Sequence, residues 1–196
     1  MQATTLSFSN IHKHGELFGN IFRARHDVFV ARNKWTLTNA DGMEYDQYDT
    51  PACRWIAIHD ENKKVLAGVR LTPTTAKNGM YSYMIKDAQQ GLLDSIPENI
   101  MDEVAPVSED IWEGTRIFVT QDVPGKERFR IHLQLVHQMI EAAQELGAKR
   151  IIGIIPHTMC KAGKRMGVDI HEAGPVMEID GQNNVCVSIN VQPEIH

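Results

Sequence analysis

The segment that decides the fold is residues 111–155, which read IWEGTRIFVTQDVPGKERFRIHLQLVHQMIEAAQELGAKRIIGII. Its first ten residues are rich in β-branched and aromatic side chains, which are typical of a strand. Residues 127–146 then repeat apolar side chains at helical spacing and stop at Gly147. Residues 149–155 contain an apolar run that predicts a buried strand. A strand, a helix and a second strand in this order predict a βαβ crossover.

Further strands and helices are expected on both sides of this segment. Residues 54–60 and 65–72 are joined by a polar turn, which predicts a β-hairpin. The other expected elements are helices at 15–33, 84–90, 97–104 and 157–166, and two or three final strands from the alternating stretches 168–173, 175–180 and 184–191. A hairpin followed by a βαβ crossover predicts a mixed sheet with helices on both faces. No repeat or linker interrupts the sequence, so we expect a single domain over residues 1–196.

The composition argues against several classes of protein. Apolar residues make up 42% and charged residues 23%, as in ordinary globular domains. The 20 Lys and Arg residues against 25 Asp and Glu give a net charge of −5, which argues against a nucleic-acid binder. No apolar run approaches the roughly 20 residues that span a bilayer, so we expect no membrane span. The spacing of Cys53, Cys160 and Cys186, and the absence of a signal-peptide pattern, favour a reduced, cytoplasmic protein.

Charged residues embedded in apolar elements form the first candidate site. Arg25 lies on the apolar face of the helix expected at 15–33, and Arg70 and Arg116 lie within expected strands. An ordered loop, residues 34–53, carries the run Gly42-Met-Glu-Tyr-Asp-Gln-Tyr-Asp49. Taken alone, this run could be a solvated acidic turn or a calcium loop, but the acid spacing of an EF-hand is missing. The embedded arginines suggest that its acids have partners instead.

These embedded charges are expected to converge, because breaking a buried ion pair costs about 3–5 kcal/mol. The predicted cluster contains Arg25, Asp46, Asp49, Arg70, Glu113 and Arg116. The alternative is a set of ordinary, separate ion pairs. Glu113 and Arg116 are three residues apart, so a flat strand would point them to opposite faces. We expect Gly114, which lies between them, to host a β-bulge that re-aims one side chain.

Other motifs indicate little chemistry. His12, His14, His157 and Cys160 could bind a metal, but no third ligand has a suitable spacing, so we expect no metal site. The sequence contains no nucleophile elbow, no dinucleotide-binding glycine loop and no P-loop.

The sequence resembles the LuxI-type acyl-homoserine-lactone synthases, the bacterial autoinducer synthases. In chain order, the resemblance is carried by Arg25-x-x-x-Phe29, Trp35, Gly42-x-Glu-Tyr-Asp-x-Tyr-Asp49, Gly68-Val-Arg-Leu-x-Pro-Thr74 and Trp112-Glu-x-x-Arg116. It covers roughly residues 20–170. The resemblance implies a fold like that of the GNAT acyltransferases. That fold is a three-layer α/β/α arrangement whose twisted mixed sheet is splayed in the middle, with helices on both faces.

Two positions depart from the family pattern. The phenylalanine usual after a Met-Leu-x-Asp segment is replaced by Ala88 and Gln89, so that pocket wall is either missing or supplied by Tyr81 or Tyr83. The strand end that tunes acyl selectivity in the family reads Ile-Pro-His-Thr at residues 155–158. The acyl-chain preference therefore does not carry over.

The implied reaction joins S-adenosylmethionine to a fatty acyl thioester. The α-amine attacks the thioester, and the methionyl carboxylate then displaces methylthioadenosine and closes the lactone. S-adenosylmethionine is a substrate, so no cofactor is implied. The glycine-rich pyrophosphate loop of true acetyltransferases is absent between Val119 and Arg130. This favours an acyl carrier protein as the donor, with acyl-CoA as the alternative.

The resemblance also implies residue roles. Glu113 would be the base, and the other catalytic residues would be Asp46, Arg70 and Arg116. The S-adenosylmethionine-binding residues would be Arg25, Phe29, Trp35 and Asp49, with the aromatics near the sulfonium. An α-amine titrates near 8, so a weak base suffices. The rival interpretations are a GNAT-type N-acyltransferase that uses acyl-CoA, and an inactive ligand-binding relative.

A basic patch on this acidic chain is expected to bind the carrier protein. Lys161, Lys164 and Arg165 share one face of the helix expected at 157–166, and Lys149 and Arg150 precede it. Acyl carrier proteins are acidic, and charge complementarity guides specific docking. The alternative is an ordinary solvated helix face.

Overall fold

The structure of the protein, a computed structural model, describes residues 1–191, so the last five residues of the expected domain lie outside it. Two compact units are built from discontinuous segments. The first contains Met1–Leu71 and Arg116–Ala142, and the second contains Thr72–Thr115 and Ala143–His196. Strand β6 (Ile111–Val119) runs from the second unit into the first. The expectation of one domain stays a prediction.

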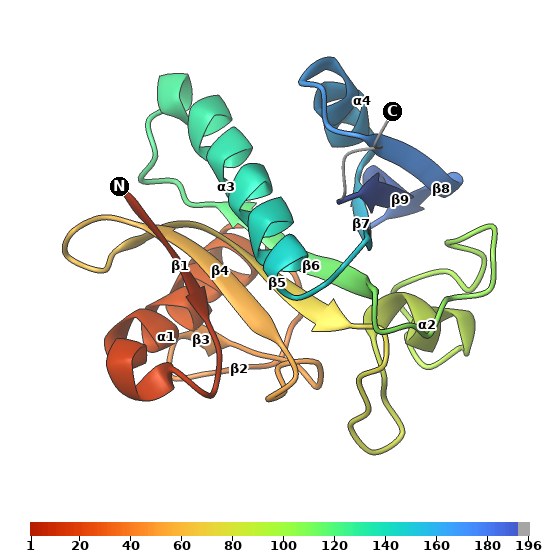
Figure 1. The fold of residues 1–196 in the computed structure, drawn as a ribbon, viewed down its shortest axis with the longest axis horizontal. Helices are drawn as coiled ribbons and strands as arrows, with labels where there is room; N and C mark the ends of the chain where they lie inside the picture. The colour runs from red at the N-terminus through yellow and green to blue at the C-terminus, as the bar shows by residue number, and fades with distance from the viewer. Residues whose placement is uncertain (192–196) are drawn as a thin grey trace. The chain divides into compact units, whose positions relative to one another are not determined.

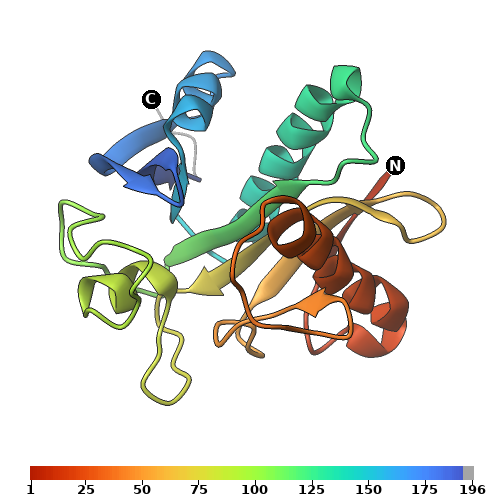
Figure 2. The ribbon, with the colours of Figure 1, turned by 180° about the vertical axis from the view of Figure 1, so that it is seen from behind.

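The first unit is an antiparallel sheet between two helices. Strand β1 (Gln2–Leu6) pairs with β4 (Arg54–His59), and β4 pairs with β5 (Val65–Pro73). Helices α1 (Ile11–Arg25) and α3 (Gly125–Glu145) lie on opposite faces of these strands (Figures 1 and 2). Trp55 and Ala57, two residues apart on β4, point to one face and pack with the apolar side of α1.

The N-terminal helix and the loop after it place the candidate residues of this unit. Helix α1 continues directly into a π-helical turn, η1 (His26–Arg32), which together confirm the helix expected at 15–33. A short hairpin of β2 (Asn39–Ala40) and β3 (Met43–Glu44) interrupts the expected loop. Single π-helical turns are rare and occur frequently at functional sites.

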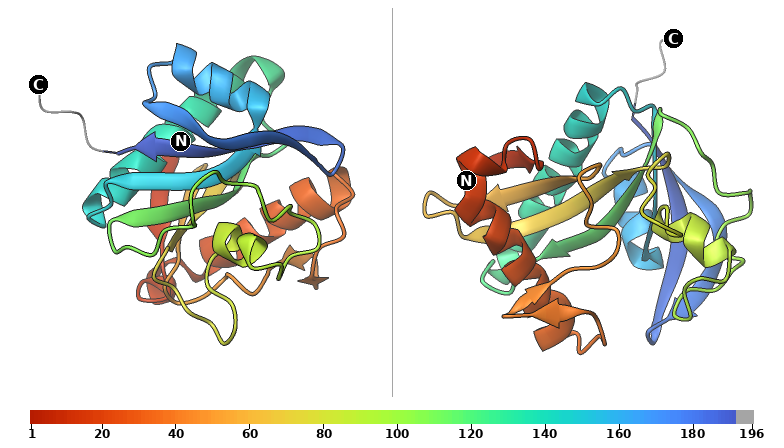
Figure 3. Two further views of the ribbon diagram at one scale, coloured as in Figure 1. Left: turned by 90° about the vertical axis from the view of Figure 1, so that its right-hand side faces the viewer. Right: turned by 90° about the horizontal axis from the view of Figure 1, so that it is seen from below.

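The second unit contains the crossover end of the sheet. β6 pairs in parallel with β7 (Arg150–Pro156) over three residue pairs, and β7 and β8 (Ile170–Ile179) flank β9 (Gln182–Asn190) in antiparallel ladders. Helices α2 (Met84–Gln89) and α4 (His157–Arg165) lie on opposite sides of these strands (Figure 3). The hairpin, the βαβ crossover and the helices at α2, α3 and α4 are thereby confirmed.

One expected element is absent, one strand was not expected, and the number of final strands was left open. Strand β1 was not predicted, because its short sequence QATTL shows no clear alternation. The helix expected at 97–104 does not form. There Ile100 and Met101 are both buried, and the Gln89 side chain donates to the carbonyls of Met101 and Glu103. The end of the described chain forms two strands, within the expected two or three, because one strand, β8, covers most of 168–173 and 175–180 with a register shift between Glu172 and Val176.

No helix among residues 1–191 is long and apolar enough to cross a membrane.

Candidate active site

Six charged side chains of the first unit form a closed ring of alternating charge, which we call the charge ring. In order around the ring they are Arg25, Glu44, Arg116, Asp46, Arg70 and Asp49. Glu44 joins two of the arginines, with Oε2 at 2.5 Å from Nε of Arg25 and Oε1 at 3.1 Å from Nη2 of Arg116. Three guanidinium groups face three carboxylates, so the ring as a whole carries no net charge.

The two aspartates complete the ring. Asp46 contacts Nη2 of Arg116 at 2.9 Å and Nη1 of Arg70 at 2.5 Å. Asp49 contacts Nη1 of Arg70 at 3.0 Å and accepts two parallel bonds from Arg25, at 2.7 and 2.9 Å. The indole N–H of Trp55 also donates to Asp49. Bidentate, charge-assisted pairs of this kind are the strongest hydrogen bonds that side chains make.

The arginines of the ring keep its aspartates charged in spite of their burial. Arg25, Glu44 and Arg70 are fully buried. Burial raises the pKa of Asp46, but Arg70 and Arg116 outweigh it and hold that pKa below its ordinary value. Arg70 and Arg25 likewise lower the pKa of Asp49 against the effect of burial. Both aspartates are therefore charged at neutral pH.

The backbone at Arg116 turns that side chain into the ring. Arg116 has φ of 54°, the left-handed region, which is rarely populated by residues other than glycine. The irregularity in β6 was expected at Gly114, but it lies at Arg116. Gly114 is packed against β7, since a Cβ atom on Gly153 would come within 2.6 Å of its carbonyl oxygen. Strained backbone of this kind costs roughly 1–3 kcal/mol and clusters at functional sites.

Aromatic rings line the charge ring. Phe29 stacks on Trp35 with centroids 5.1 Å apart, and the guanidinium of Arg116 lies 5.7 Å from the centre of the Phe29 ring. Phe29 is buried, whereas Trp35 keeps part of its surface in contact with solvent. The expected grouping of Arg25, Phe29 and Trp35 in one ligand pocket stays a prediction.

Glu113 belongs to the part of strand β6 in the second unit, and its carboxylate meets the start of helix α2. Its carboxylate is fully buried and accepts hydrogen bonds from the backbone N–H groups of Met84 and Ile85, at 3.0 and 2.7 Å. Burial and then the nearby charge of Glu113 raise the pKa of the Cys186 thiol to about 12. The same two causes raise the pKa of Tyr83, whose hydroxyl donates to the carbonyl of Pro106. Tyr83 is therefore part of the buried interior of this unit.

The expected basic patch is divided by its ion pairs. Lys161, Lys164 and Arg165 are exposed on α4, and Lys164 lies 3.6 Å from Glu172 of β8. Lys149 pairs with Asp110 at 3.1 Å, and Arg150 pairs with Glu103 at 3.0 Å. Ion pairs of this patch therefore involve Lys149, Arg150 and Lys164.

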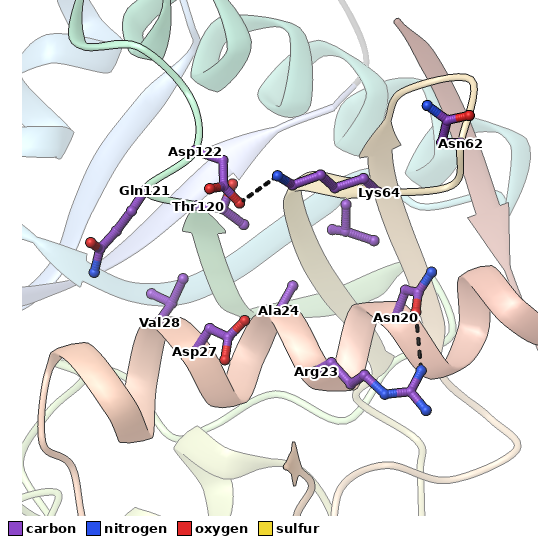
Figure 4. Close-up of a pocket in the computed structure, with 11 residues that line it drawn as sticks. Asn20, Arg23, Ala24, Asp27, Val28, Asn62, Lys64, Thr120, Gln121 and Asp122 are labelled. Atoms are coloured by element: carbon purple, nitrogen blue, oxygen red, sulfur yellow. Dashed lines mark hydrogen bonds and ion pairs between the residues drawn. The ribbon is translucent and has the colours of Figure 1, made fainter.

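A separate cavity of about 480 Å³ lies beside α1 in the first unit (Figure 4). Lys64 and Asp122 form an ion pair of 3.0 Å at its edge, and Arg23 donates to Asn20. The cavity shares no residue with the charge ring or with any predicted site. Among residues 1–191, no group of three or more His, Cys, Asp or Glu side chains could hold a metal ion.

Comparison with known proteins gives the family of this chain, whose curated relatives are acyltransferases that make acyl-homoserine lactones. The sequence profile described as autoinducer synthase matches residues 9–194, and the chain belongs to this family. It is 32% identical over 173 residues to the acyl-homoserine-lactone synthase of Ralstonia solanacearum, covering 85% of this chain and 78% of that protein. Over 190 residues it is 26% identical to the acyl-homoserine-lactone synthase of Acinetobacter nosocomialis, covering 94% of this chain and 97% of that protein.

Solved structures agree with this assignment. The crystal structure of TofI in a ternary complex with an inhibitor and MTA has a TM-score of 0.77 and 25% identity, covering 98% of this chain and 92% of that one. The crystal structure of the AHL synthase LasI has a TM-score of 0.79 and 22% identity, covering 97% and 90%. The expected GNAT-like mixed α/β fold is confirmed.

Glu44 is the ring member that sequence analysis missed as a site residue. The sequence correctly indicated three embedded arginines and their need for three acids, but it chose Glu113 with Asp46 and Asp49. Glu44 belongs to the motif that carries the family resemblance, and its position in the acidic run was the available signal. The convergence of Glu113 with the other five residues stays a prediction.

Proposed function

We propose that this chain is an acyl-homoserine-lactone synthase that converts S-adenosylmethionine and an acyl thioester into an N-acyl-homoserine lactone. The observation that carries the proposal is the charge ring, whose residues come from the motifs shared with the autoinducer synthases. The match to the TofI complex, which contains MTA, supports methylthioadenosine as the second product. We treat residues 1–196 as one synthase domain, because β6 carries Glu113 in one unit and Arg116 in the other.

In this proposal the ring is a rigid wall with one accessible edge. The side chains that reach solvent are those of Arg116, Asp46 and Asp49, which are 12%, 10% and 8% exposed. The other three members of the ring are fully buried. The edge residues would therefore meet the amino-acid end of S-adenosylmethionine. Arg116 would hold the carboxylate, and Asp46 or Asp49 would hold the amine. The buried Arg25 and Arg70 would position these groups rather than contact the ligand.

The stacked pair of Phe29 and Trp35 would lie near the sulfonium of S-adenosylmethionine. Phe29 is already covered by Trp35 and lies near the guanidinium of Arg116. The partly exposed Trp35 is the better candidate for contact with the sulfonium, since a cation over an indole face is attracted to it.

Glu113 would accept the proton of the attacking amine, directly or through a water molecule. The backbone N–H groups of Met84 and Ile85, at the start of α2, donate to its carboxylate. These fixed amides hold the carboxylate in one orientation, which favours proton transfer at a defined position. The amine would then attack the thioester carbonyl and expel the thiol.

Lactone closure would follow without a further cofactor. The methionyl carboxylate would attack its own γ-carbon, the C–S bond would break, and the electron pair would leave on the sulfur of methylthioadenosine. The positive sulfonium becomes a neutral thioether, so the leaving group needs no protonation.

The acyl donor would be an acyl carrier protein that docks on α4. The exposed Lys161, Lys164 and Arg165 would supply the attraction, and Lys149 and Arg150 would contribute less because Asp110 and Glu103 compensate them. We place the reaction in the cytoplasm, a proposal supported by three buried cysteine thiols.

One incubation separates the candidate functions. Purified protein is mixed with S-adenosylmethionine and either an acyl carrier protein donor, a matched acyl-CoA or acetyl-CoA, and the products are read by mass spectrometry. The proposal predicts equal amounts of acyl-homoserine lactone and methylthioadenosine, fastest with the carrier protein. An N-acetylated amine without methylthioadenosine would indicate an ordinary N-acetyltransferase, and no product with any donor would indicate an inactive relative.

A further inference from the structure

We propose that Glu44 is a positioning residue that fixes Arg116 at the accessible edge of the charge ring and thereby controls lactone closure. The inference rests on the proposed function, because it concerns the same reaction. Glu44 is the only fully buried carboxylate of the ring, and it comes from the two-residue strand β3. A buried carboxylate in so short an element is held by its contacts rather than by a ladder of backbone bonds.

The two oxygens of Glu44 have different tasks. Oε2 accepts a hydrogen bond from Nε of Arg25 at 2.5 Å. Oε1 accepts one from Nε of Arg116 at 3.1 Å and lies 3.1 Å from Nη2 of the same arginine. Glu44 thus connects the end of α1 with β6. It sets the distance between two arginines that are far apart in sequence.

Loss of Glu44 would affect these two arginines unequally. Arg25 would keep its bidentate pair with Asp49. Arg116 would keep its ion pair with Asp46, but that aspartate is also held by Arg70 in two hydrogen bonds. Arg116 therefore depends on Glu44 more than Arg25 does.

The backbone of Arg116 makes this dependence greater. A left-handed φ of 54° is unfavourable for an arginine and persists only where surrounding contacts enforce it. Glu44 and the nearby Phe29 ring are two of those contacts. Without the carboxylate, we expect the guanidinium to leave the position in which it would hold the substrate carboxylate.

This role predicts a defect in one chemical step. Acyl transfer needs the amine and Glu113, whereas lactone closure needs the carboxylate aimed at the γ-carbon. A displaced Arg116 would slow closure more than acyl transfer. The open intermediate, N-acyl-S-adenosylmethionine, would then be released in place of part of the lactone.

The test compares Glu44→Gln with Glu61→Gln. Both changes remove one carboxylate from the first unit, but Glu61 is exposed on the turn between β4 and β5. Steady-state kinetics, the ratio of open acylated product to lactone, and the melting temperature are measured for each. We expect Glu44→Gln to lower lactone formation at least tenfold and to raise the open-product ratio at least fivefold. Glu61→Gln should change each quantity by less than twofold.

A second variant separates positioning from a charge defect. Glu44→Gln leaves one surplus positive charge in the ring, and adding Arg116→Gln removes it. The double variant should recover part of the melting temperature but none of the lactone ratio. Glu44→Asp keeps the charge on a shorter side chain and should give an intermediate ratio.

Two results would overturn the inference. One is an unchanged product ratio in Glu44→Gln at full saturation with S-adenosylmethionine, which would make Glu44 purely structural. The other is recovery of the ratio in the double variant. Absence of any lactone from the unmodified protein would instead refute the proposed function. The non-additive melting temperatures of the single and double variants would still test the ring contact in that case.

Discussion

The charge ring and Glu113 are two ways of keeping a carboxylate charged inside a protein. Each of the three acids of the ring lies between two arginines of the first unit, and the positive and negative charges cancel. In the second unit, Glu113 accepts hydrogen bonds from two backbone N–H groups that carry no full charge. A closed ring of charges resists change, which suits a wall. A carboxylate held by two backbone amides is kept in one orientation, which suits a proton acceptor.

The largest expected effect comes from breaking the ring at its most buried arginine. Arg70→Met leaves Asp46 and Asp49 without a shared partner, so the free energy of unfolding should fall by about 3–5 kcal/mol. Denaturant unfolding followed by fluorescence measures it. Arg23→Met, at an exposed residue that pairs with Asn20, is the control and should change stability by less than about 0.5 kcal/mol. A loss of under about 1 kcal/mol in Arg70→Met would mean that the ring stabilises little.

A smaller and more local effect is expected at Glu113. Glu113→Ala removes the acceptor of two N–H groups at the start of α2, which should cost roughly 2–3 kcal/mol. Hydrogen exchange should show faster exchange at the amides of Met84 and Ile85 but unchanged exchange in α1. Unchanged protection at these two amides would contradict the contact.

Acid should remove the contribution of the charge ring to stability. The pKa values of Asp46 and Asp49 are lowered in the folded state, so their contribution is complete above the ordinary aspartate pKa, near 4. The aspartates' contribution to the free energy of unfolding is lost as the pH falls from about 4 towards the lowered pKa values of the folded state. The loss is up to about 1.4 kcal/mol per pH unit for each aspartate. Unfolding curves from pH 6 to pH 2 for Asp49→Asn and the unmodified protein measure this. Parallel curves would show that Asp49 does not contribute.

The smallest effect concerns the surface of α4. Charge reversal at Lys161 and Lys164 should raise KM for a carrier-protein donor severalfold at low salt and much less at high salt, because salt screens exposed charges. KM for S-adenosylmethionine should stay within twofold. An unchanged donor KM at low ionic strength would exclude this face as the docking surface and would favour an acyl-CoA donor.

Sequence analysis succeeded where the chemistry of single residues is decisive. An arginine on an apolar helix face or in a buried strand must find acids, so Arg25 and Arg70 could be placed in a cluster. The strands and the crossover helix followed from periodicity. The family resemblance supplied the reaction, which no pattern of charges could have given.

The failures came from tertiary contacts that override local sequence. The Gln89 amide bonds to the backbone of Met101, Glu103 and Ala105, and the helix expected at 97–104 does not form. The left-handed Arg116 could not be foreseen, since a β-bulge at the neighbouring glycine is the less costly solution. Glu44 was missed because Glu113, with Asp46 and Asp49, already supplied three acids for the three arginines.

The most direct test of this comparison is Glu113→Gln measured beside Asp87→Asn. Both acids are buried and accept hydrogen bonds at the start of α2, Asp87 from the backbone and hydroxyl of Ser82. Turnover per folded molecule and the affinity for S-adenosylmethionine are measured for both variants. If Glu113 accepts the proton, Glu113→Gln should lower kcat by about 100-fold or more and leave the affinity within threefold, with less than a tenfold change in Asp87→Asn. Equal losses of kcat in the two variants, or an equal loss of affinity and turnover in Glu113→Gln, would contradict the account.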